Sequence, residues 1–157
     1  MKILITGGAG YIGSILVEYL VENNHQVTVV DNFMYESNTL ACYCNKKNFS
    51  IINKDVRDYD FLSKEIGKYE VIIPLAALVG APLCSQRKED AESINLNHNI
   101  KLFKMIKGDQ KIIMPTTNSA YGHGKEKEIF DESSKLNPIS LYAKHKVAVE
   151  KELSNLN

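Results

Sequence analysis

A tyrosine and a lysine near the end of the chain have a spacing that suits acid–base chemistry. Tyr142 and Lys146 are four residues apart, which places them on one face of a helix. An ammonium group within reach of a phenol favours the phenolate, so we expect Lys146 to lower the pKa of Tyr142 from its ordinary value of about 10. Such a phenolate can take a proton from a hydroxyl group while hydride leaves the adjacent carbon. The same spacing is common on surface helices, so its meaning depends on motifs upstream. We expect His145 in a solvated helix position.

Three glycines near the N-terminus have a spacing that suits the binding of a phosphate-containing ligand. Gly7, Gly10 and Gly13 recur every third residue after the apolar run Lys2–Thr6 and lead into an amphipathic segment. Strand, glycine turn and helix in this order suit the pyrophosphate of a dinucleotide. Gly7 permits the sharp turn, Gly10 lets the backbone approach the phosphates, and Gly13 lets the helix lie close to the strand. The anion then lies on unpaired N–H groups at the positive end of the helix dipole. The alternative is a loop that merely joins a strand to a helix.

An acidic residue follows the second predicted strand at a distance that fits the same ligand. The apolar run Gln26–Val30 ends at Asp31, eighteen residues after Gly13. A carboxylate there accepts hydrogen bonds from the adenosine ribose hydroxyls and repels the additional phosphate of NADP. We therefore expect NAD rather than NADP, with a turn aspartate in Asp31–Asn32 as the alternative.

Further groups follow the ends of other predicted strands, which is where ligands of such sheets bind. We expect Asp55 to accept from the adenine amine and a backbone group of Val56 to meet the ring edge, with a loop aspartate as the alternative. The small residues of Leu75–Ala77 leave room for the nicotinamide ribose, although alanine after a buried strand is often simple packing. The hydroxyl of Thr117 is placed to bind the same substrate oxygen as Tyr142.

Strand and helix patterns alternate along the chain, which is typical of a parallel sheet covered on both faces. The predicted strands are Lys2–Thr6, Gln26–Asp31, Phe49–Asn53, Glu70–Pro74 and Lys111–Pro115. The predicted helices are Tyr11–Asn23, Tyr59 to about Gly67, about Glu89 to Lys107, and about Ile139 to Leu153. Asp58 is the expected N-cap of the second helix and Gly108 the expected end of the third, while a loop is expected around Gly80 and Pro82. The expected fold is α/β: a doubly wound parallel sheet in three αβα layers, with strand order 3-2-1-4-5.

The bulk properties of the chain argue against several classes of protein. Its 157 residues suffice for one domain with a core, but not for two of ordinary size. Nineteen basic and nineteen acidic residues cancel, so nothing points to nucleic acid or to an anionic membrane surface. No apolar stretch is long enough to span a membrane, and the N-terminus lacks a signal-peptide layout. Cys42, Cys44 and Cys84 are odd in number and lack metal-ligand spacing, so we expect reduced thiols, a cytoplasmic location and no bound metal.

These motifs together resemble those of the extended short-chain dehydrogenase/reductases, in the NAD-dependent epimerase/dehydratase family that acts on nucleotide sugars. The resemblance is carried, in family order, by Thr6–Gly13, Asp31–Asn32, Asp55–Val56, Leu75–Ala77, Asn95, Thr116–Gly122 and Tyr142–Lys146. It implies a Rossmann domain over residues 1–157 with tightly held NAD.

The resemblance also implies a catalytic triad of Thr117, Tyr142 and Lys146. Tyr142 is then the base, and Thr117 orients the reacting hydroxyl. Lys146 also holds the nicotinamide ribose, and Asn95 steadies the lysine through water. The residues implied to bind the cofactor are Gly7, Gly10, Tyr11, Ile12, Gly13, Asp31, Asn32, Asp55, Val56, Leu75, Ala76, Ala77, Asn95, Tyr142 and Lys146.

Three positions depart from the family pattern. The dehydratases and decarboxylases of the family usually carry acidic residues just before the Tyr–Gly pair, where this chain has Asn118 and Ser119. Eliminating water from a sugar needs an acid that protonates the leaving hydroxyl. The resemblance therefore implies reversible hydride transfer at C4 of a nucleotide sugar, as in a 4-epimerase, with a 4-dehydrogenase as the alternative. Pro74 stands where many relatives have a histidine, which is a minor difference.

Family members are usually longer and carry a C-terminal domain that holds the sugar nucleotide. We expect this chain to lack that substrate domain and to be a truncated form. Inactivity of the chain alone, as a non-catalytic NAD-binding module, is a second alternative. Relatives commonly pair through two helices of each subunit. The corresponding expectation here is a homodimer through the helices that begin near Glu89 and Ile139.

Overall fold

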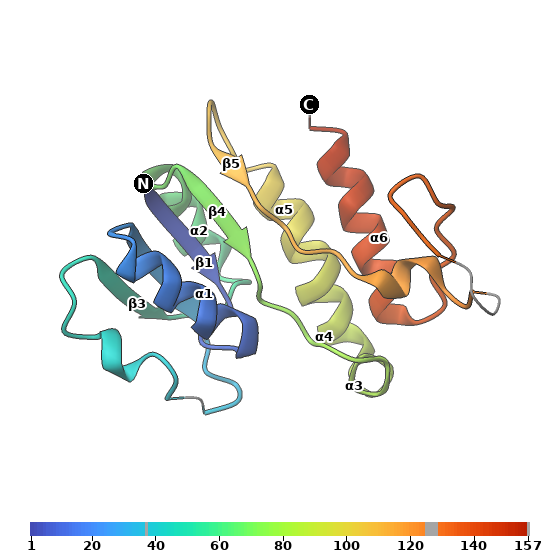
Figure 1. Ribbon diagram of the computed structural model, residues 1–157, viewed down its shortest axis with the longest axis horizontal. Helices are drawn as coiled ribbons and strands as arrows, with labels where there is room; N and C mark the ends of the chain where they lie inside the picture. The colour runs from blue at the N-terminus through green and yellow to red at the C-terminus, as the bar shows by residue number, and fades with distance from the viewer. Residues whose placement is uncertain (37, 125–128, 157) are drawn as a thin grey trace. The chain divides into compact units, whose positions relative to one another are not determined.

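The computed structural model describes residues 1–36, 38–124 and 129–156. These residues form two compact units, which are treated separately below. Unit 1 comprises Met1–Ala77 and Lys104–Pro115, and unit 2 comprises Leu78–Phe103 and Thr116–Asn157 (Figure 1). The parallel sheet and the glycine motif belong to unit 1, whereas Tyr142 and Lys146 belong to unit 2.

Unit 1 is built on one sheet of five parallel strands (Figure 1). The strands are β1 (Lys2–Thr6), β2 (Gln26–Asp31), β3 (Phe49–Asn53), β4 (Val71–Pro74) and β5 (Lys111–Ile112). Their order is β3-β2-β1-β4-β5, which confirms the predicted doubly wound topology. In the central strand Thr6 pairs with Val30 on one side and with Pro74 on the other, so the carboxyl ends of three strands meet at one edge.

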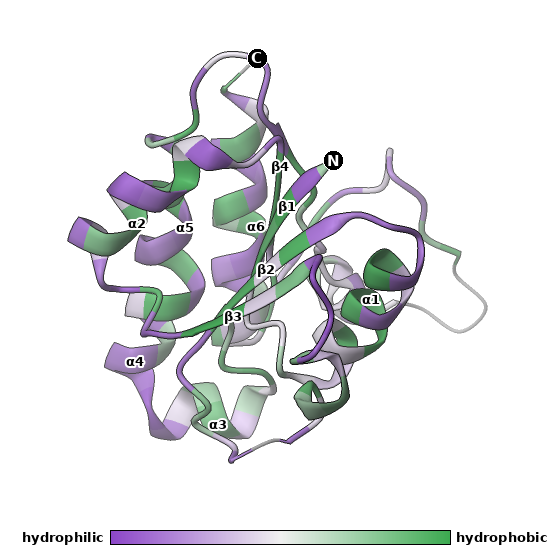
Figure 2. Cartoon of the chain, turned by 90° about the vertical axis from the view of Figure 1, so that its left-hand side faces the viewer, coloured by the Kyte–Doolittle hydropathy of each residue, from purple (hydrophilic) through white to green (hydrophobic). Residues whose placement is uncertain are grey.

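Helices cover both faces of this sheet within unit 1, as predicted for an αβα arrangement. Helix α1 (Tyr11–Glu22) lies on one face and α2 (Tyr59–Glu65) on the other (Figure 2). Side chains alternate between the faces along each strand. On the α1 face, the strands and the helix bury a shared cluster that includes Ile3, Ile5, Val17, Leu20, Val21, Val27, Val29, Phe49, Val71 and Ile73. Each fully buried aliphatic side chain of this kind contributes about 1.5–3 kcal/mol relative to an exposed one.

The connections around β3 carry short helical turns and side-chain anchors. The 3₁₀ turn η1 (Ala41–Tyr43) lies between β2 and β3, and the 3₁₀ turn η2 (Ile66–Lys68) follows α2 directly. Asp58 is the N-cap of α2 and accepts a hydrogen bond from the backbone N–H of Phe61 at 3.1 Å, which confirms the predicted cap.

The turn between β3 and α2 is held by the carboxylate of Asp55. One oxygen accepts from the backbone N–H and the Nε of Arg57, both at 2.8 Å. The other accepts from Arg57 Nη2 at 2.7 Å and from the amide of Asn32 at 3.2 Å. The Arg57 guanidinium holds the pKa of Asp55 well below its usual range, which opposes the effect of partial burial. These hydrogen bonds of Asp55 with Arg57 and Asn32, called the Asp55 fork below, join the ends of β2 and β3.

Unit 2 is an assembly of helices (Figure 1). Helix α3 (Ala81–Gln86) is followed by α4 (Lys88–Glu92), the π-helical segment η3 (Ser93–His98) and α5 (Asn99–Phe103), which run on without a break from Lys88. The 3₁₀ turn η4 (Asn118–Tyr121) and α6 (Leu141–Ser154) complete it. Helix α6 contacts α3, η3, α5 and η4. Its N-cap is Ser140, whose hydroxyl accepts from the backbone N–H of Ala143 at 3.1 Å.

Three predicted elements differ from the structure in unit 2 or at its margins. The expected loop around Gly80 and Pro82 contains helix α3, because Gly80 serves as its N-cap with φ +97° and proline is compatible with a first helical turn. The long predicted helix ends at Phe103 rather than at Lys107. Gly108, with φ +59°, therefore lies in the turn before β5 and is not a helix cap.

The fifth strand is shorter than the predicted Lys111–Pro115. Only Lys111 and Ile112 pair with β4, although Ile113 still donates its N–H to the carbonyl of Ile72 at 3.0 Å. The side chain of Ile113 is exposed, and Pro115 has no N–H to continue the ladder. The remaining differences from the predicted bounds are shifts of one to three residues at element ends.

The Asp55 fork predicts a specific dependence of stability on pH. A carboxyl with a lowered folded pKa stabilises the fold above the unfolded pKa of about 3.9, and this contribution is lost as the pH falls through the folded pKa. We expect Asp55→Asn to lower the free energy of unfolding at pH 7, with a difference from wild type that shrinks steadily below about pH 4.

Urea unfolding followed by far-UV circular dichroism measures this, since the protein has no tryptophan. The control is Asp109→Asn, which removes an exposed carboxylate from the turn before β5. A difference between Asp55→Asn and wild type that stays constant from pH 7 to pH 2 would contradict the assigned ion pair.

Candidate functional site

The glycine turn after β1 is held against the end of β4. Gly7 has φ +72°, and a Cβ at this position would lie 2.5 Å from the backbone nitrogen of Ala76. A Cβ on Gly13 would lie 2.6 Å from the Cα and the carbonyl oxygen of Gly8. Real Cβ atoms do not approach backbone atoms so closely, so both positions require glycine. The positive φ and the close approach to Ala76 fit the predicted role of Gly7 in the turn, whereas Gly13 packs against the turn at Gly8 rather than against the strand itself.

The N-terminus of α1 presents backbone donors that no described side chain caps. The helix begins at Tyr11 after its N-cap Gly10, and first-turn N–H groups have no acceptor within the helix. A Cβ on Gly10 would meet only the carbonyl oxygen of Gly7, at 3.4 Å, so the space beside Gly10 is open. Tyr11 and Ile12 have exposed side chains at this end. Free donors, a helix dipole and an open backbone face fit the phosphates of a dinucleotide.

Asp31, at the end of β2, ties the glycine turn to the next strand. Its Oδ2 accepts from the backbone N–H of Ala9 at 3.0 Å, and its Oδ1 accepts from the N–H of Phe33 at 2.8 Å. The hydroxyl of Thr39 donates to the carbonyl of Ala9 at 3.0 Å. A carboxylate has about four acceptor positions, so two remain for hydroxyl donors such as those of a ribose.

Asn32 and Asp55 follow neighbouring strands and bond to each other, as described above. All four acceptor positions of Asp55 are therefore used by Arg57 and Asn32. The predicted contact of Asp55 with an adenine amine would require the Asn32 amide to move away. The side chain of Val56 is buried, which leaves its backbone for any contact with a ring edge.

Leu75–Ala77 follows β4 in unit 1 beside the glycine turn. Leu75 donates its N–H to the carbonyl of Thr6 at 2.8 Å, and Ala76 is the backbone that excludes a side chain at Gly7. The hydroxyl of Thr6 is buried, and none of the described groups bonds to it. Unit 1 thus gathers the predicted residues from Gly7 to Ala77 around the carboxyl ends of β1, β2, β3 and β4.

Thr117 begins the turn that follows β5 in sequence and belongs to unit 2. Its hydroxyl accepts from the backbone N–H of Ser119 at 3.2 Å, so Thr117 is the N-cap of η4. Asn137 donates its N–H to the carbonyl of Ala120 at 2.8 Å, and a Cβ on Gly122 would collide with the Asn137 carbonyl oxygen. The segment before α6 is therefore packed directly on the Thr117 turn.

Tyr142 and Lys146 lie on α6, which contacts η4, as their spacing predicts. Burial raises the pKa of Tyr142, and the nearby thiol of Cys84 adds to this rise. Burial lowers the pKa of Lys146, whose side chain is only 6% exposed. The prediction that Lys146 lowers the pKa of Tyr142 is therefore wrong for the groups of the protein itself, because both side chains are withdrawn from water and each resists its charged form.

His145 is buried rather than solvated, so its predicted environment is also wrong. Its side chain is 6% exposed, and its Nδ1 has no hydrogen-bond partner among the described residues. Burial lowers the pKa of His145, which Glu92 of α4 partly opposes. Burial thus disfavours the charged form of this imidazole, which lies next to Lys146 in the chain.

Asn95 lies in the π-helical segment and is buried. Its Oδ1 accepts from the N–H of Leu78 and its Nδ2 donates to the carbonyl of Leu78, both at 2.8 Å. The same carbonyl accepts from the thiol of Cys84 at 3.2 Å. These hydrogen bonds to Leu78 do not test the prediction that Asn95 steadies Lys146 through water.

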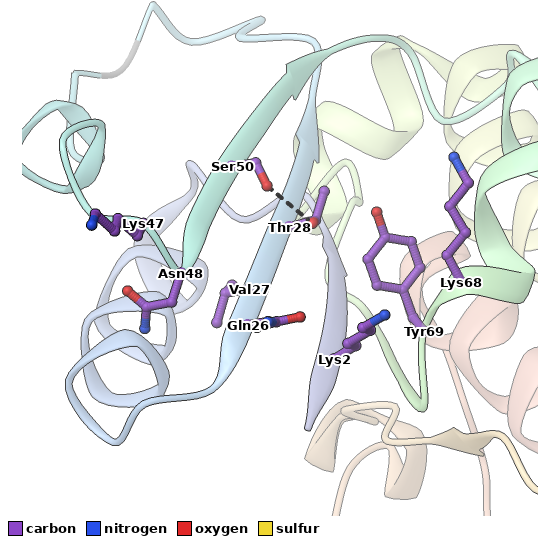
Figure 3. A pocket seen from close by; sticks show the side chains of 9 residues that line it. All are labelled: Lys2, Gln26, Val27, Thr28, Lys47, Asn48, Ser50, Lys68 and Tyr69. Carbon is purple, nitrogen blue, oxygen red and sulfur yellow. Dashed lines mark hydrogen bonds between the residues drawn. The ribbon is translucent and has the colours of Figure 1, made fainter.

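A polar hollow of about 260 Å³ lies elsewhere in unit 1 (Figure 3). Lys2, Lys47 and Lys68 line it together with hydroxyl groups of Thr28, Ser50 and Tyr69. These residues lie at the amino ends of the strands, opposite to the glycine turn, so the hollow is separate from the candidate site. Lys68 is paired there with Glu65.

No group of three or more His, Cys, Asp and Glu side chains in the described parts could hold a metal ion. Within those parts, too, none of the helices has the length and apolar character needed to cross a bilayer.

Comparison with known proteins identifies relatives of this chain. It is 32% identical over 124 residues to a UDP-N-acetyl-alpha-D-glucosaminuronate decarboxylase of Bacillus cytotoxicus, covering 78% of this chain and 38% of the relative. It is 30% identical over 157 residues to the dTDP-D-glucose 4,6-dehydratase of Mus musculus, covering 95% of this chain and 44% of the relative. The chain therefore spans less than half the length of these two relatives.

Solved structures give a consistent picture. A UDP-glucuronic acid 4-epimerase from Bacillus cereus, in complex with UDP-glucuronic acid and NAD, matches with a TM-score of 0.88 and 28% identity, covering 99% of this chain and 52% of that one. A model of the NAD dependent epimerase/dehydratase family matches residues 3–157. The chain therefore belongs to the NAD dependent epimerase/dehydratase family.

Proposed function

We propose that this chain binds NAD and takes part in reversible hydride transfer at C4 of a nucleotide sugar, as in a 4-epimerase. The observation that carries the proposal is the glycine turn. A Cβ at Gly7 or Gly13 would lie less than 3 Å from backbone atoms, so both positions need glycine, while the backbone at Gly10 stays open at an uncapped helix start. Asp31 still has acceptor positions for ribose hydroxyls, and its charge disfavours the phosphate of NADP.

In this proposal the groups of unit 2 handle the proton. Tyr142 takes the proton of the reacting hydroxyl, and Thr117 orients that hydroxyl. Lys146, which is buried on the same helix, holds the nicotinamide ribose. NAD, when bound, supplies the hydride acceptor, and its positive ring opposes the effect of burial on Tyr142. Asn95, which brackets Leu78, is proposed to steady Lys146 through water as well.

The reaction type rests on the residues before Tyr121. Asn118 and Ser119 form the start of η4, and neither supplies the acid that a dehydration needs. Simple hydride transfer and return needs only the base and the cofactor. A 4-dehydrogenase is therefore the alternative enzyme, and a non-catalytic NAD-binding module is the alternative without turnover.

The proposed partners follow from the same family relation. The substrate is a nucleotide sugar, and a second copy of the chain is proposed to pair through the Lys88–Phe103 helix and α6. The proposed location is the cytoplasm, because all three cysteines are free thiols.

The open face at Gly10 predicts a variant that folds without binding the cofactor. Gly10 has φ −76°, which alanine adopts freely, so Gly10→Ala should cost no more than about 1 kcal/mol of stability. Its methyl group occupies the space that the phosphates need, so we expect at least about a tenfold loss of NAD affinity, or about 1.4 kcal/mol. Calorimetric titration with NAD measures the loss.

The matched control is Gly67→Ala, since a Cβ there has no atom within 4 Å. It should bind NAD like wild type. If Gly10→Ala also binds NAD like wild type, the phosphates do not lie at the start of α1 and the proposed cofactor site is wrong.

The proposed base predicts a variant that binds but does not turn over. Removing the phenol oxygen in Tyr142→Phe should lower the rate about 10²–10⁴-fold, because the proton then has no positioned acceptor. The NAD affinity should change little. The rate is followed as NADH absorbance with candidate nucleotide sugars, and Tyr19→Phe on the exposed side of α1 is the control. A Tyr142→Phe protein that retains the wild-type rate would exclude Tyr142 as the base.

A further inference from the structure

Asn32 and Asp55 bond to each other at the carboxyl ends of two neighbouring strands of unit 1. Asn32 directly follows β2, and Asp55 lies just beyond β3, which pairs with β2 up to Asp31 and Asn53 (Figure 2). The Nδ2 of Asn32 donates to Oδ2 of Asp55 at 3.2 Å, and its Oδ1 accepts from the backbone N–H of Met34 at 3.1 Å. Both polar atoms of the Asn32 amide are therefore engaged within the protein.

The hydrogen bonds that Asp55 accepts differ in strength. Those from Arg57 measure 2.7 or 2.8 Å, and the ones from its guanidinium have a charged donor. Hydrogen bonds from a charged donor are about twice as strong as neutral ones. The contact with Asn32 is the longest of the Asp55 fork and comes from a neutral amide on an exposed residue. Asn32 is therefore the partner of Asp55 that a ligand can displace at the lowest cost.

The position that Asn32 occupies on Asp55 suits an amine. The exocyclic amine of adenine is, like the Asn32 amide, a neutral N–H donor, so one can replace the other on the carboxylate. Hypoxanthine has a carbonyl oxygen in place of this amine, and that oxygen would face the carboxylate with no proton between them. An exchange of partners on Asp55 therefore favours adenine over hypoxanthine.

We propose that Asn32 determines how strongly the cofactor site distinguishes adenine from other purines, because its amide holds the acceptor position of Asp55 that an adenine amine can take. Adenine binds by displacing Asn32 from Asp55, and the cost of this displacement reduces the preference for adenine. The proposal rests on the proposed NAD binding and deepens it, since it assigns to Asn32 a contact that competes with the cofactor.

Two dinucleotides and two substitutions test this competition. NAD is compared with nicotinamide hypoxanthine dinucleotide, in which a carbonyl replaces the adenine amine, by calorimetric titration of the full chain. The measured quantity is the ratio of their dissociation constants, in which contacts common to both ligands cancel. Asn32→Ala removes the competing donor, and Asp55→Asn replaces the acceptor. The control is Asn45→Ala, since Asn45 is an exposed asparagine in the turn before β3.

We expect wild type to bind NAD more tightly than the hypoxanthine dinucleotide. Asn32→Ala should raise this preference about two- to tenfold, which corresponds to the net strength of one neutral hydrogen bond. Asp55→Asn should lower the preference at least about tenfold, because its amide can donate to the hypoxanthine carbonyl. Asn45→Ala should leave the preference unchanged.

A preference in Asn32→Ala that equals or falls below that of wild type overturns the proposal, even if Asp55→Asn fails to fold. A folded Asp55→Asn protein that retains the full preference overturns it as well. If both dinucleotides bind and the preference does not respond to Asn32→Ala, only the role of Asn32 fails. If wild type binds neither dinucleotide, the proposed NAD binding fails and the role of Asn32 fails with it.

Discussion

The close approach of the glycine turn to the end of β4 is the constraint on which the remaining arrangement of unit 1 depends. A side chain at Gly7 would lie 2.5 Å from the backbone of Ala76, and one at Gly13 would lie 2.6 Å from Gly8. Without these contacts α1 could not begin directly over the carboxyl ends of β1 and β4. The Asp31 carboxylate holds the turn from its other side through the N–H of Ala9. The direction of the free helix donors is therefore fixed by steric contact and by one hydrogen bond.

Local pattern was sufficient to predict the elements of unit 1 that carry this turn. β1, β2 and β3 have the predicted bounds because each is a short apolar run closed by a polar or turn residue. Asp58 caps α2 as its position suggests. Helix α3 was missed because glycine and proline at its start are ordinary loop signals, and six residues form a helix only with tertiary support. The π-helical segment around Asn95 was missed for a related reason, since its bracket on Leu78 joins residues seventeen positions apart.

For the candidate site, too, the sequence indicates which residues matter but not what surrounds them. Spacing singled out Asp31, Asp55 and Tyr142 as candidate site residues, but it could not reveal what each contacts. The sequence pattern predicted that Asp55 accepts a hydrogen bond from an adenine amine. In the structure Arg57 and Asn32 occupy all its acceptor positions. The pKa of Tyr142 is raised rather than lowered, because burial is decided by elements far apart in sequence. The sequence therefore predicts least well the chemistry that depends on the charge of buried side chains.

The central claim is that the turn from Gly7 to Gly13, together with Asp31, binds an adenine dinucleotide. Calorimetric titration of the chain with NAD and, separately, with NADP tests it most directly. The account predicts saturable binding of one NAD per chain, with NADP at least about tenfold weaker because its additional phosphate meets the Asp31 carboxylate. Absence of saturable NAD binding by the folded chain, or equal affinity for NADP, would contradict it.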